Sequence, residues 1–220
     1  ANVHRLLSTL LQRGLVEQDD RRRYQPGSAL VALGLQRLDR DPVTAAARGE
    51  LLAAAEALGE TVFLAGPRGG PLVVLDTAEG TGVLRAAPRS GETVPIHATA
   101  VGKLALAHAP DIVALGGSEL RAFTATTATS HADLDAEVRR AALRGWAENR
   151  EEWIPGLSVV AVPVLRAQRL VGALALAAAT VRIEALGRLH VANRLQAAAR
   201  RIESKLVTPS PRDPTPRSAA

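Results

Sequence analysis

The chain has 220 residues, of which 47% are hydrophobic and 22% charged, and it contains neither cysteine nor methionine. These values are typical of a globular protein with one large or two small domains, and the lack of cysteine excludes disulfide scaffolds, thiolate nucleophiles and cysteine-ligated zinc. The net charge of +5 is concentrated at the two ends: residues 1–40 carry +3, residues 200–220 carry +3, and the segment between them carries −1. This distribution favours a polyanion-binding N-terminal segment joined to a nearly neutral body.

The first 40 residues predict a helix, a hairpin and a second helix. Apolar side chains recur at helical spacing over residues 3–11, and Gly14 follows as a stop signal. Residues 15–27 indicate a short hairpin with a cationic tip at residues 19–23, and Ser28 can cap a leucine-rich helix after it. A helix, a basic hairpin and another helix make up the back half of a winged helix-turn-helix domain.

Residues 41–206 predict an α+β domain with a mostly antiparallel sheet. Asp41 and Pro42 are typical of the start of a helix, which apolar spacing extends to Leu58. The later elements, in chain order, are strands over residues 61–65, 72–75 and 83–86, helices over 98–109 and 132–146, strands over 158–165 and 170–177, and a helix over 181–206. The last two strands are continuously apolar, as central strands are when helices cover the sheet. The proline-rich tail from Thr208 is expected to be disordered.

Four blocks of sequence stand in a specific order and spacing. They are Val3-His4-Arg5-Leu6-Leu7 with Gly14-Leu15-Val16, then Tyr24-Gln25-Pro26-Gly27, then Gly91 with residues 95–103, and last Arg144-Gly145-Trp146 with Glu151-Glu152 and residues 155–164. Together these blocks resemble the IclR (isocitrate lyase regulator) family of bacterial transcriptional regulators, up to Leu206. The resemblance implies a winged helix-turn-helix, a linker helix and a GAF-like effector-binding domain with helices flanking its sheet, assembled as a homodimer or a dimer of dimers.

On this resemblance, the chain divides into a partial winged helix-turn-helix domain at residues 1–27, a linker helix at 28–40, an effector-binding domain at 41–207 and a disordered tail at 208–220. The family has two further helices upstream of residue 1, so we treat residue 1 as a cut end. We expect weak or no DNA binding by these 220 residues alone and specific binding by a longer gene product.

We expect a cytoplasmic protein with no membrane partner. No signal-peptide pattern opens the sequence. The longest apolar stretch, residues 170–181, is far shorter than the roughly 20 residues of a membrane span.

The resemblance places two groups of side chains against a double-stranded DNA operator. One lies on the first helix, where Arg and Asn could read G and A bases, and the other on the hairpin tip, which could clamp phosphates or enter the minor groove. The predicted DNA-binding residues are Asn2, His4, Arg5, Arg21, Arg22 and Arg23. Without the resemblance, a solvated helix face and an ordinary charged turn would be the simpler interpretation.

The resemblance places an effector pocket between residues 96–103 and the last two long strands. The start of the helix there offers free N–H groups that suit a carboxylate. The predicted effector-binding residues are Ala98, Thr99, Ala100, Gly102, Asn149, Ser158, Ala175 and Ala177.

Four of these residues depart from the family pattern. Asn149 and Ser158 stand where the family often has Asp and Cys, and Ala175 and Ala177 stand where members that bind small oxo-acids have Ser. The departures soften or remove polar contacts. Our hypothesis is therefore an effector bulkier or more apolar than glyoxylate or pyruvate, such as an aromatic acid. The alternative, that the two alanines are merely small residues in a packed strand, stays open.

Other motifs do not indicate an enzyme. His97 and Lys103 are interpreted as a helix-start histidine and a surface lysine, and Ser158 lacks the Gly-x-Ser-x-Gly context of a nucleophile elbow. The five histidines have no paired metal-ligand spacing. Trp146 and Trp153 are interpreted as core anchors or interface residues rather than pocket walls. We therefore expect no catalysis, no cofactor and no metal.

The sequence thus predicts a ligand-responsive DNA-binding transcriptional regulator, a repressor rather than an activator. Its effector domain would control operator binding through rearrangement of a dimer or tetramer. Two alternatives remain: a stand-alone GAF-like sensor or interaction module without DNA binding, and a hydrolase that uses Ser158 and His97.

Overall fold

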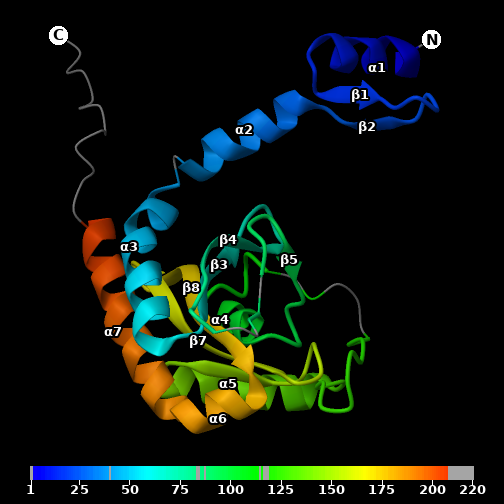
Figure 1. Ribbon diagram of the computed structural model, residues 1–220. Helices are drawn as coiled ribbons and strands as arrows, with labels where there is room; N and C mark the ends of the chain where they lie inside the picture. The colour runs from blue at the N-terminus through cyan, green and yellow to red at the C-terminus, as the bar shows by residue number, and fades with distance from the viewer. Residues whose placement is uncertain are drawn as a thin grey trace, which may run out of the picture. The chain divides into compact units, whose positions relative to one another are not determined.

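The structure of the chain, a computed structural model, describes residues 2–39, 41–82, 85–86, 88–113, 115 and 119–207. It contains two compact units, residues 1–45 and residues 46–220 (Figure 1). Within the described ranges, no helix is both long and apolar enough to cross a membrane. The tail expected to be disordered, residues 208–220, lies outside the described residues.

The first unit begins with the predicted helix, hairpin and helix. These are α1 (Asn2–Gln12), β1 (Val16–Gln18), β2 (Tyr24–Pro26) and α2 (Ser28–Asp39). Gly14, with a φ of 65°, adopts the left-handed conformation that favours glycine just after a helix. Gly27 packs so closely against the carbonyl of Gly14 that a Cβ atom at position 27 would overlap it. The two glycines therefore allow the hairpin to fold back against the end of α1.

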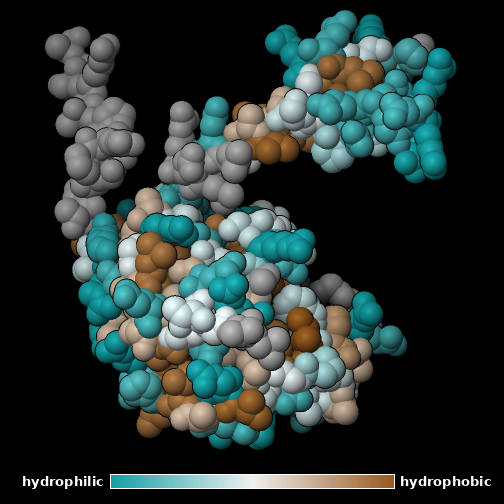
Figure 2. Space-filling model, viewed as in Figure 1, coloured by the Kyte–Doolittle hydropathy of each residue, from teal (hydrophilic) through white to brown (hydrophobic). Residues whose placement is uncertain are grey.

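The surface of the first unit combines polar and apolar groups. Figure 2 shows hydrophilic residues over much of its visible surface, next to apolar patches. Val3 and Leu6 of α1 and Leu30, Val31 and Leu33 of α2 are exposed. The described residues of this unit thus leave these apolar side chains uncovered.

α3 (Pro42–Leu58) begins in the first unit and continues into the second. The carboxylate of Asp41 accepts hydrogen bonds from the backbone N–H groups of Val43 at 3.0 Å and Thr44 at 3.2 Å. These bonds cap the helix. The start predicted from Asp41 and Pro42 is confirmed.

A six-stranded sheet forms the centre of the second unit, in the order β5-β4-β3-β8-β7-β6. The strands are β3 (Thr61–Pro67), β4 (Leu72–Ala78), β5 (Thr93–Val94), β6 (Ala147–Arg150), β7 (Leu157–Arg166) and β8 (Arg169–Ala179). Every neighbouring pair is antiparallel, which confirms the predicted α+β class. Most side chains of β7 and β8 are buried on both faces, and this explains their continuous apolar sequences.

Helices lie against the sheet (Figure 1). α4 (Ala100–His108) shares one buried apolar cluster with Val159 and Ala161 of β7, and α5 (His131–Arg144) packs against α4. The intervening side chains of β7, such as Val160, point to the opposite face, where α7 (Arg188–Val207) lies along this strand. A salt bridge of 2.7 Å between Glu50 of α3 and Arg201 of α7 also links these two helices.

Two predicted elements differ from the structure, and two short strands, β5 and β6, were not predicted. Of the strand expected over residues 83–86, residues 83 and 84 lie outside the described residues, and residues 85 and 86 are not in a strand. β6 is not predicted from the sequence, because three of its four side chains are polar. The single helix expected over residues 181–206 is two helices, α6 (Thr180–Leu186) and α7, because Gly187 adopts a φ of 80° and ends α6.

Candidate functional site

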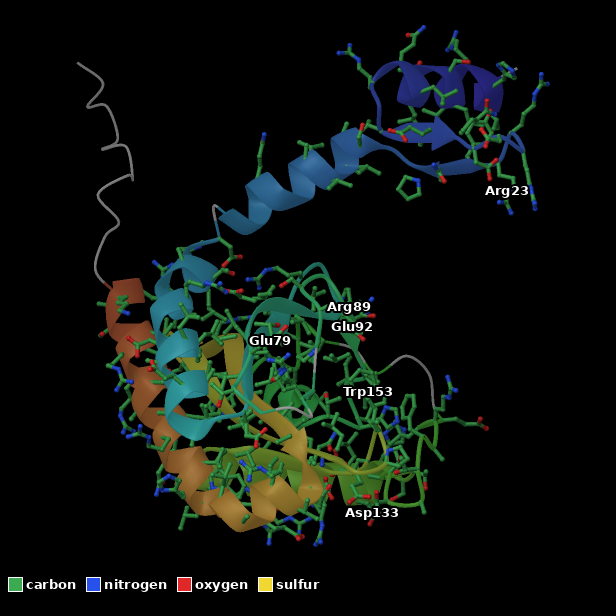
Figure 3. The ribbon with its side chains drawn as sticks, viewed as in Figure 1. Arg23, Glu79, Arg89, Glu92, Asp133 and Trp153 are labelled. Atoms are coloured by element: carbon green, nitrogen blue, oxygen red, sulfur yellow. The ribbon has the colours of Figure 1, made fainter. Side chains whose placement is uncertain are left out.

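The second unit contains an apolar cavity of about 320 Å³ beside the start of α4. Its walls come from β3, β5, β6, β7, β8, the start of α4, and residues 86, 88, 92, 153 and 154 of the connecting segments. The apolar lining residues are Phe63, Ala86, Pro88, Val94, Val101, Trp153, Ile154, Leu157, Val159 and Ala177, and the polar ones are Glu92, Thr99 and Asn149. Figure 3 labels Glu92, which precedes β5, and Trp153, which follows β6. We call this space the apolar cavity.

Asn149, which lines the apolar cavity, has a buried side-chain oxygen with no hydrogen-bond partner among the described residues. Its side-chain nitrogen donates a hydrogen bond to the carbonyl oxygen of Ala98 at 2.7 Å. A carbonyl oxygen can only accept, so the amide nitrogen must face Ala98 and Oδ1 must point elsewhere. Oδ1 is buried and has no hydrogen-bond partner among the described residues. Such a group costs free energy until a donor satisfies it, and a ligand hydroxyl or amine would do so.

Thr99 caps α4 at the edge of the apolar cavity. Its hydroxyl donates to the carbonyl of Pro95 at 2.6 Å and accepts from the N–H of Gly102 at 3.1 Å. The N–H of Gly102 is therefore used within the protein, although it was predicted to bind an effector. The N–H groups of Ala100 and Val101, in the first turn of α4, have no intrahelical acceptor. They remain suited to a carboxylate.

Gly102 has a packing role instead. A Cβ atom at this position would overlap the backbone of Ile96. The close approach holds the start of α4 against the segment that precedes it, which positions Thr99.

The predicted residues of β7 and β8 separate into two groups. Ala177 lines the apolar cavity, whereas Ala175 is fully buried in the core cluster opposite Phe63. Ser158 lies between two cavity-lining residues of β7, so strand alternation turns it to the other face. There its hydroxyl contacts that of Thr180 at 2.9 Å. Ser158 does not line the apolar cavity.

The structure changes the interpretation of Trp153. Trp153 lines the apolar cavity rather than anchoring the core. Trp146 is half-buried, and the guanidinium of Arg144 lies 3.7 Å from the centre of its ring.

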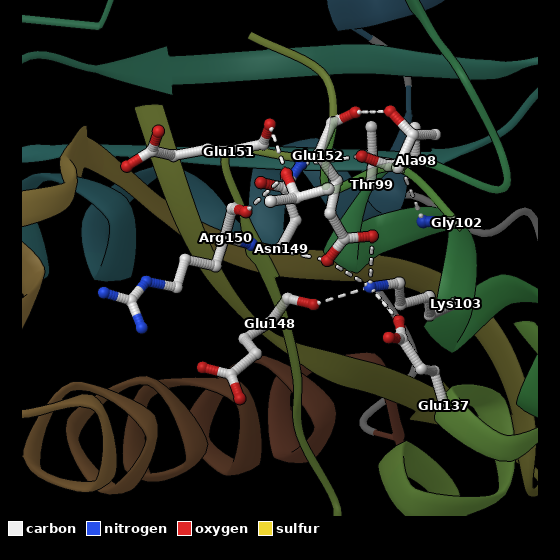
Figure 4. Close-up of polar contacts among 12 residues, drawn as sticks. Ala98, Thr99, Gly102, Lys103, Glu137, Glu148, Asn149, Arg150, Glu151 and Glu152 are labelled. Atoms are coloured by element: carbon white, nitrogen blue, oxygen red, sulfur yellow. Dashed lines mark hydrogen bonds and ion pairs between the residues drawn. The ribbon is translucent and has the colours of Figure 1, made fainter. Parts of the chain in front are cut away.

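Lys103, expected at the surface, is buried with 3% of its side chain exposed. Its ammonium group lies 2.6 and 2.7 Å from the two carboxylate oxygens of Glu152, forms an ion pair with Glu137, and donates to the backbone oxygen of Glu148 at 3.0 Å (Figure 4). Burial raises the pKa of the Glu152 carboxyl, and the nearby Lys103 opposes this effect. The cluster binds α4, α5 and the end of β6 together.

His97 and Ser158 do not form a catalytic pair. His97 Nε2 lies 2.8 Å from the backbone oxygen of Arg121, and its ring stacks on Phe123. Ser158 is bonded to Thr180. Each side chain is therefore engaged in a different part of the second unit.

All six residues predicted to contact DNA lie in the first unit and are exposed. Asn2, His4 and Arg5 begin α1, and Arg21, Arg22 and Arg23 lie in the turn of the hairpin. The carboxylate of Asp19 organises that turn, since it accepts hydrogen bonds from the N–H groups of Arg21 at 2.9 Å and Arg23 at 2.8 Å. It also pairs with the Arg23 guanidinium at 2.8 Å. Figure 3 shows Arg23 at this turn.

Comparisons with known proteins point to one family. The family model described as "Bacterial transcriptional regulator IclR C-terminal" matches residues 35–204, and the one described as "IclR helix-turn-helix domain" matches residues 1–20. A probable transcriptional regulator of Cupriavidus necator, SauR, is 34% identical over 168 residues, which are 74% of this chain and 67% of that protein.

Solved structures agree with these matches. A putative IclR transcriptional regulator from Silicibacter sp. TM1040 is 27% identical, with a TM-score of 0.80 over 96% of this chain and 85% of that chain. An IclR homolog from Microbacterium hydrocarbonoxydans, solved in complex with 4-hydroxybenzoate, has a TM-score of 0.75 over 93% of this chain and 85% of that chain. At 19% identity, the second likeness is one of fold alone.

Proposed function

Because the chain belongs to the IclR family of bacterial transcriptional regulators, we propose that it is a ligand-responsive DNA-binding repressor whose second unit binds a small organic acid in the apolar cavity. Its relatives are named as transcriptional regulators. The observation that carries the proposal is a mostly apolar cavity beside the first turn of α4, lined by Asn149, whose buried side-chain oxygen has no partner among the described residues.

The lining of the apolar cavity favours an aromatic acid that carries a hydroxyl group. A ring would contact the apolar walls, the carboxylate would face the first-turn N–H groups of α4, and the hydroxyl would donate to Asn149 Oδ1. Few polar partners remain for glyoxylate or pyruvate, because position 177 is alanine and the hydroxyl of Ser158 points away from the apolar cavity. The Microbacterium hydrocarbonoxydans homolog, which has the same fold, was solved with a molecule of this class.

On this proposal, residues 1–27 belong to the DNA-binding domain, residues 28–40 form the linker helix and residues 41–207 form the effector-binding domain. The exposed start of α1 would contact bases and the arginines of the hairpin turn would contact phosphates of the operator. The protein would act as a homodimer or a dimer of dimers. An effector then changes operator binding only if its affinity differs between two assembly states.

Calorimetric titration with a panel of acids tests the ligand class. We expect 4-hydroxybenzoate to bind at least about tenfold more tightly than pyruvate or glyoxylate, which corresponds to roughly 1.4 kcal/mol. Benzoate, which lacks the hydroxyl donor for Asn149, should bind more weakly than 4-hydroxybenzoate and more tightly than pyruvate or glyoxylate. Tighter binding of the two- or three-carbon oxo-acids would overturn the assignment.

A further inference from the structure

The second unit contains another cavity, whose lining is charged rather than apolar. It has a volume of about 210 Å³ and is lined by residues of α4, α5, β6, the start of α7 and Glu152. Nearly all of its lining is charged, and no residue lines both this cavity and the apolar one. We call it the polar cavity.

β6 contributes residues to both cavities. Asn149 lines the apolar cavity, while Ala147, Glu148 and Arg150 line the polar cavity. Figure 4 shows the side chains of Glu148 and Arg150 extending to one side, away from Thr99 and Gly102 at the start of α4. The polar cavity is therefore a separate site and not an extension of the effector site.

The pairing of charges in the polar cavity is uneven. Lys103 and Glu152 form a tight pair, with contacts of 2.6 and 2.7 Å. By contrast, one carboxylate, that of Glu148, serves both Arg144 at 3.4 Å and Arg188 at 3.1 Å. Charge-assisted N–H···O bonds are commonly about 2.7–2.9 Å long. These two arginines thus share a single anion through long contacts and keep donors for another acceptor.

A third arginine has a similar environment. Arg140 lies one turn before Arg144 on α5, and its guanidinium is 3.7 Å from the carboxylate of Glu137, which already pairs with Lys103. Arg150 is engaged with Glu184. Apart from Arg150, the lining therefore has four cations, those of Lys103 and the three loosely paired arginines. It has three carboxylates, those of Glu137, Glu148 and Glu152, so the polar cavity has a cationic excess.

We propose that the polar cavity binds a phosphate group, held by the guanidinium groups of Arg140, Arg144 and Arg188. The planar fork of arginine matches the oxygens of phosphate. Arg144 is fixed in place, since its Nε donates to the backbone oxygen of Trp146 at 2.7 Å and its guanidinium stacks on that ring. Arg188 is the first residue of α7, whose N-terminal end favours an anion. The phosphate group belongs either to inorganic phosphate or to a small phosphorylated metabolite.

Thermal unfolding and calorimetry of the chain in sodium phosphate test the proposal, with sodium chloride at matched ionic strength as the reference. We expect a saturable rise in Tm with phosphate alone. Arg140→Gln and Arg188→Gln should each weaken phosphate binding about tenfold, because each removes a charge-assisted hydrogen bond. Arg139→Gln is the matched control, because Arg139 is an exposed neighbour on α5 that does not line the cavity.

Two results would overturn the proposal: the same rise in Tm with chloride, or unchanged phosphate affinity in Arg188→Gln. A titration with 3-phosphoglycerate distinguishes the two sources of the phosphate group. Binding tighter than that of inorganic phosphate indicates a phosphorylated metabolite, and equal or weaker binding indicates free phosphate. None of these readouts depends on the effector or on DNA.

Discussion

Replacement of Lys103 by Met is expected to destabilise the second unit by about 3–5 kcal/mol, the range for removing one partner of a buried ion pair. Methionine retains most of the length of the side chain but leaves Glu152 and Glu137 without their buried cation. Urea unfolding of the two proteins measures the loss. Lys205→Met is the control: Lys205 is half-exposed, and its partner Glu50 keeps Arg201, so a loss below about 1 kcal/mol is expected.

The pH dependence of the Lys103→Met variant gives a second readout. Burial raises the pKa of Glu152 above the ordinary value of 4.5, so the folded state holds this proton more tightly than the unfolded state does. The contribution of such a group to the free energy of unfolding is fully present below the ordinary pKa, and it is lost as the pH rises through the raised pKa of the folded state. Without Lys103, burial acts unopposed and the loss should be larger in neutral than in acidic solution. An equal loss of stability in neutral and in acidic solution would contradict the assigned role of Glu152.

Replacement of Ala177 by Leu is expected to abolish most effector binding, with a loss of about a hundredfold in affinity. The isobutyl group would extend from β8 into the apolar cavity and occupy the space of the ligand. A hundredfold corresponds to roughly 2.7 kcal/mol, near the upper end of the cost of overpacking a filled site. Because the cavity accommodates the larger side chain when no ligand is present, the free energy of unfolding should change little.

Calorimetric titration with 4-hydroxybenzoate measures the effect of Ala177→Leu. Ala142→Leu, which adds the same group at an exposed position of α5, is the control and should bind as the unaltered chain does. Full affinity in Ala177→Leu would mean that the ligand binds outside the apolar cavity.

Local signals in the sequence predict most of the fold. The start of α3 follows from Asp41 and Pro42, and β7 and β8 follow from apolar runs too long for exposed strands. β6 could not be predicted, because a four-residue strand with three polar side chains is recognisable only by its pairing with β7. The break between α6 and α7 depends on one glycine, and a single glycine does not always end a helix.

The candidate site is less accessible to sequence reasoning. Thr99, Asn149 and Ala177 were expected at the effector site from the family resemblance, and all three line the apolar cavity. Ser158 was expected there too, but its direction depends on strand alternation within a uniformly apolar run. The burial of Lys103 leaves no local signature, because its two carboxylate partners lie 34 and 49 residues away in the chain.

The most direct test of the account is the affinity of the gene product for an operator fragment, measured by fluorescence anisotropy with and without 4-hydroxybenzoate at a concentration that saturates the apolar cavity. The account predicts that the ligand changes operator affinity at least about fivefold, the lower end of typical allosteric coupling, and that Ala177→Leu removes the change. Unchanged operator affinity with the apolar cavity saturated, or no operator binding at all, would contradict it and favour a sensor module that does not act through DNA.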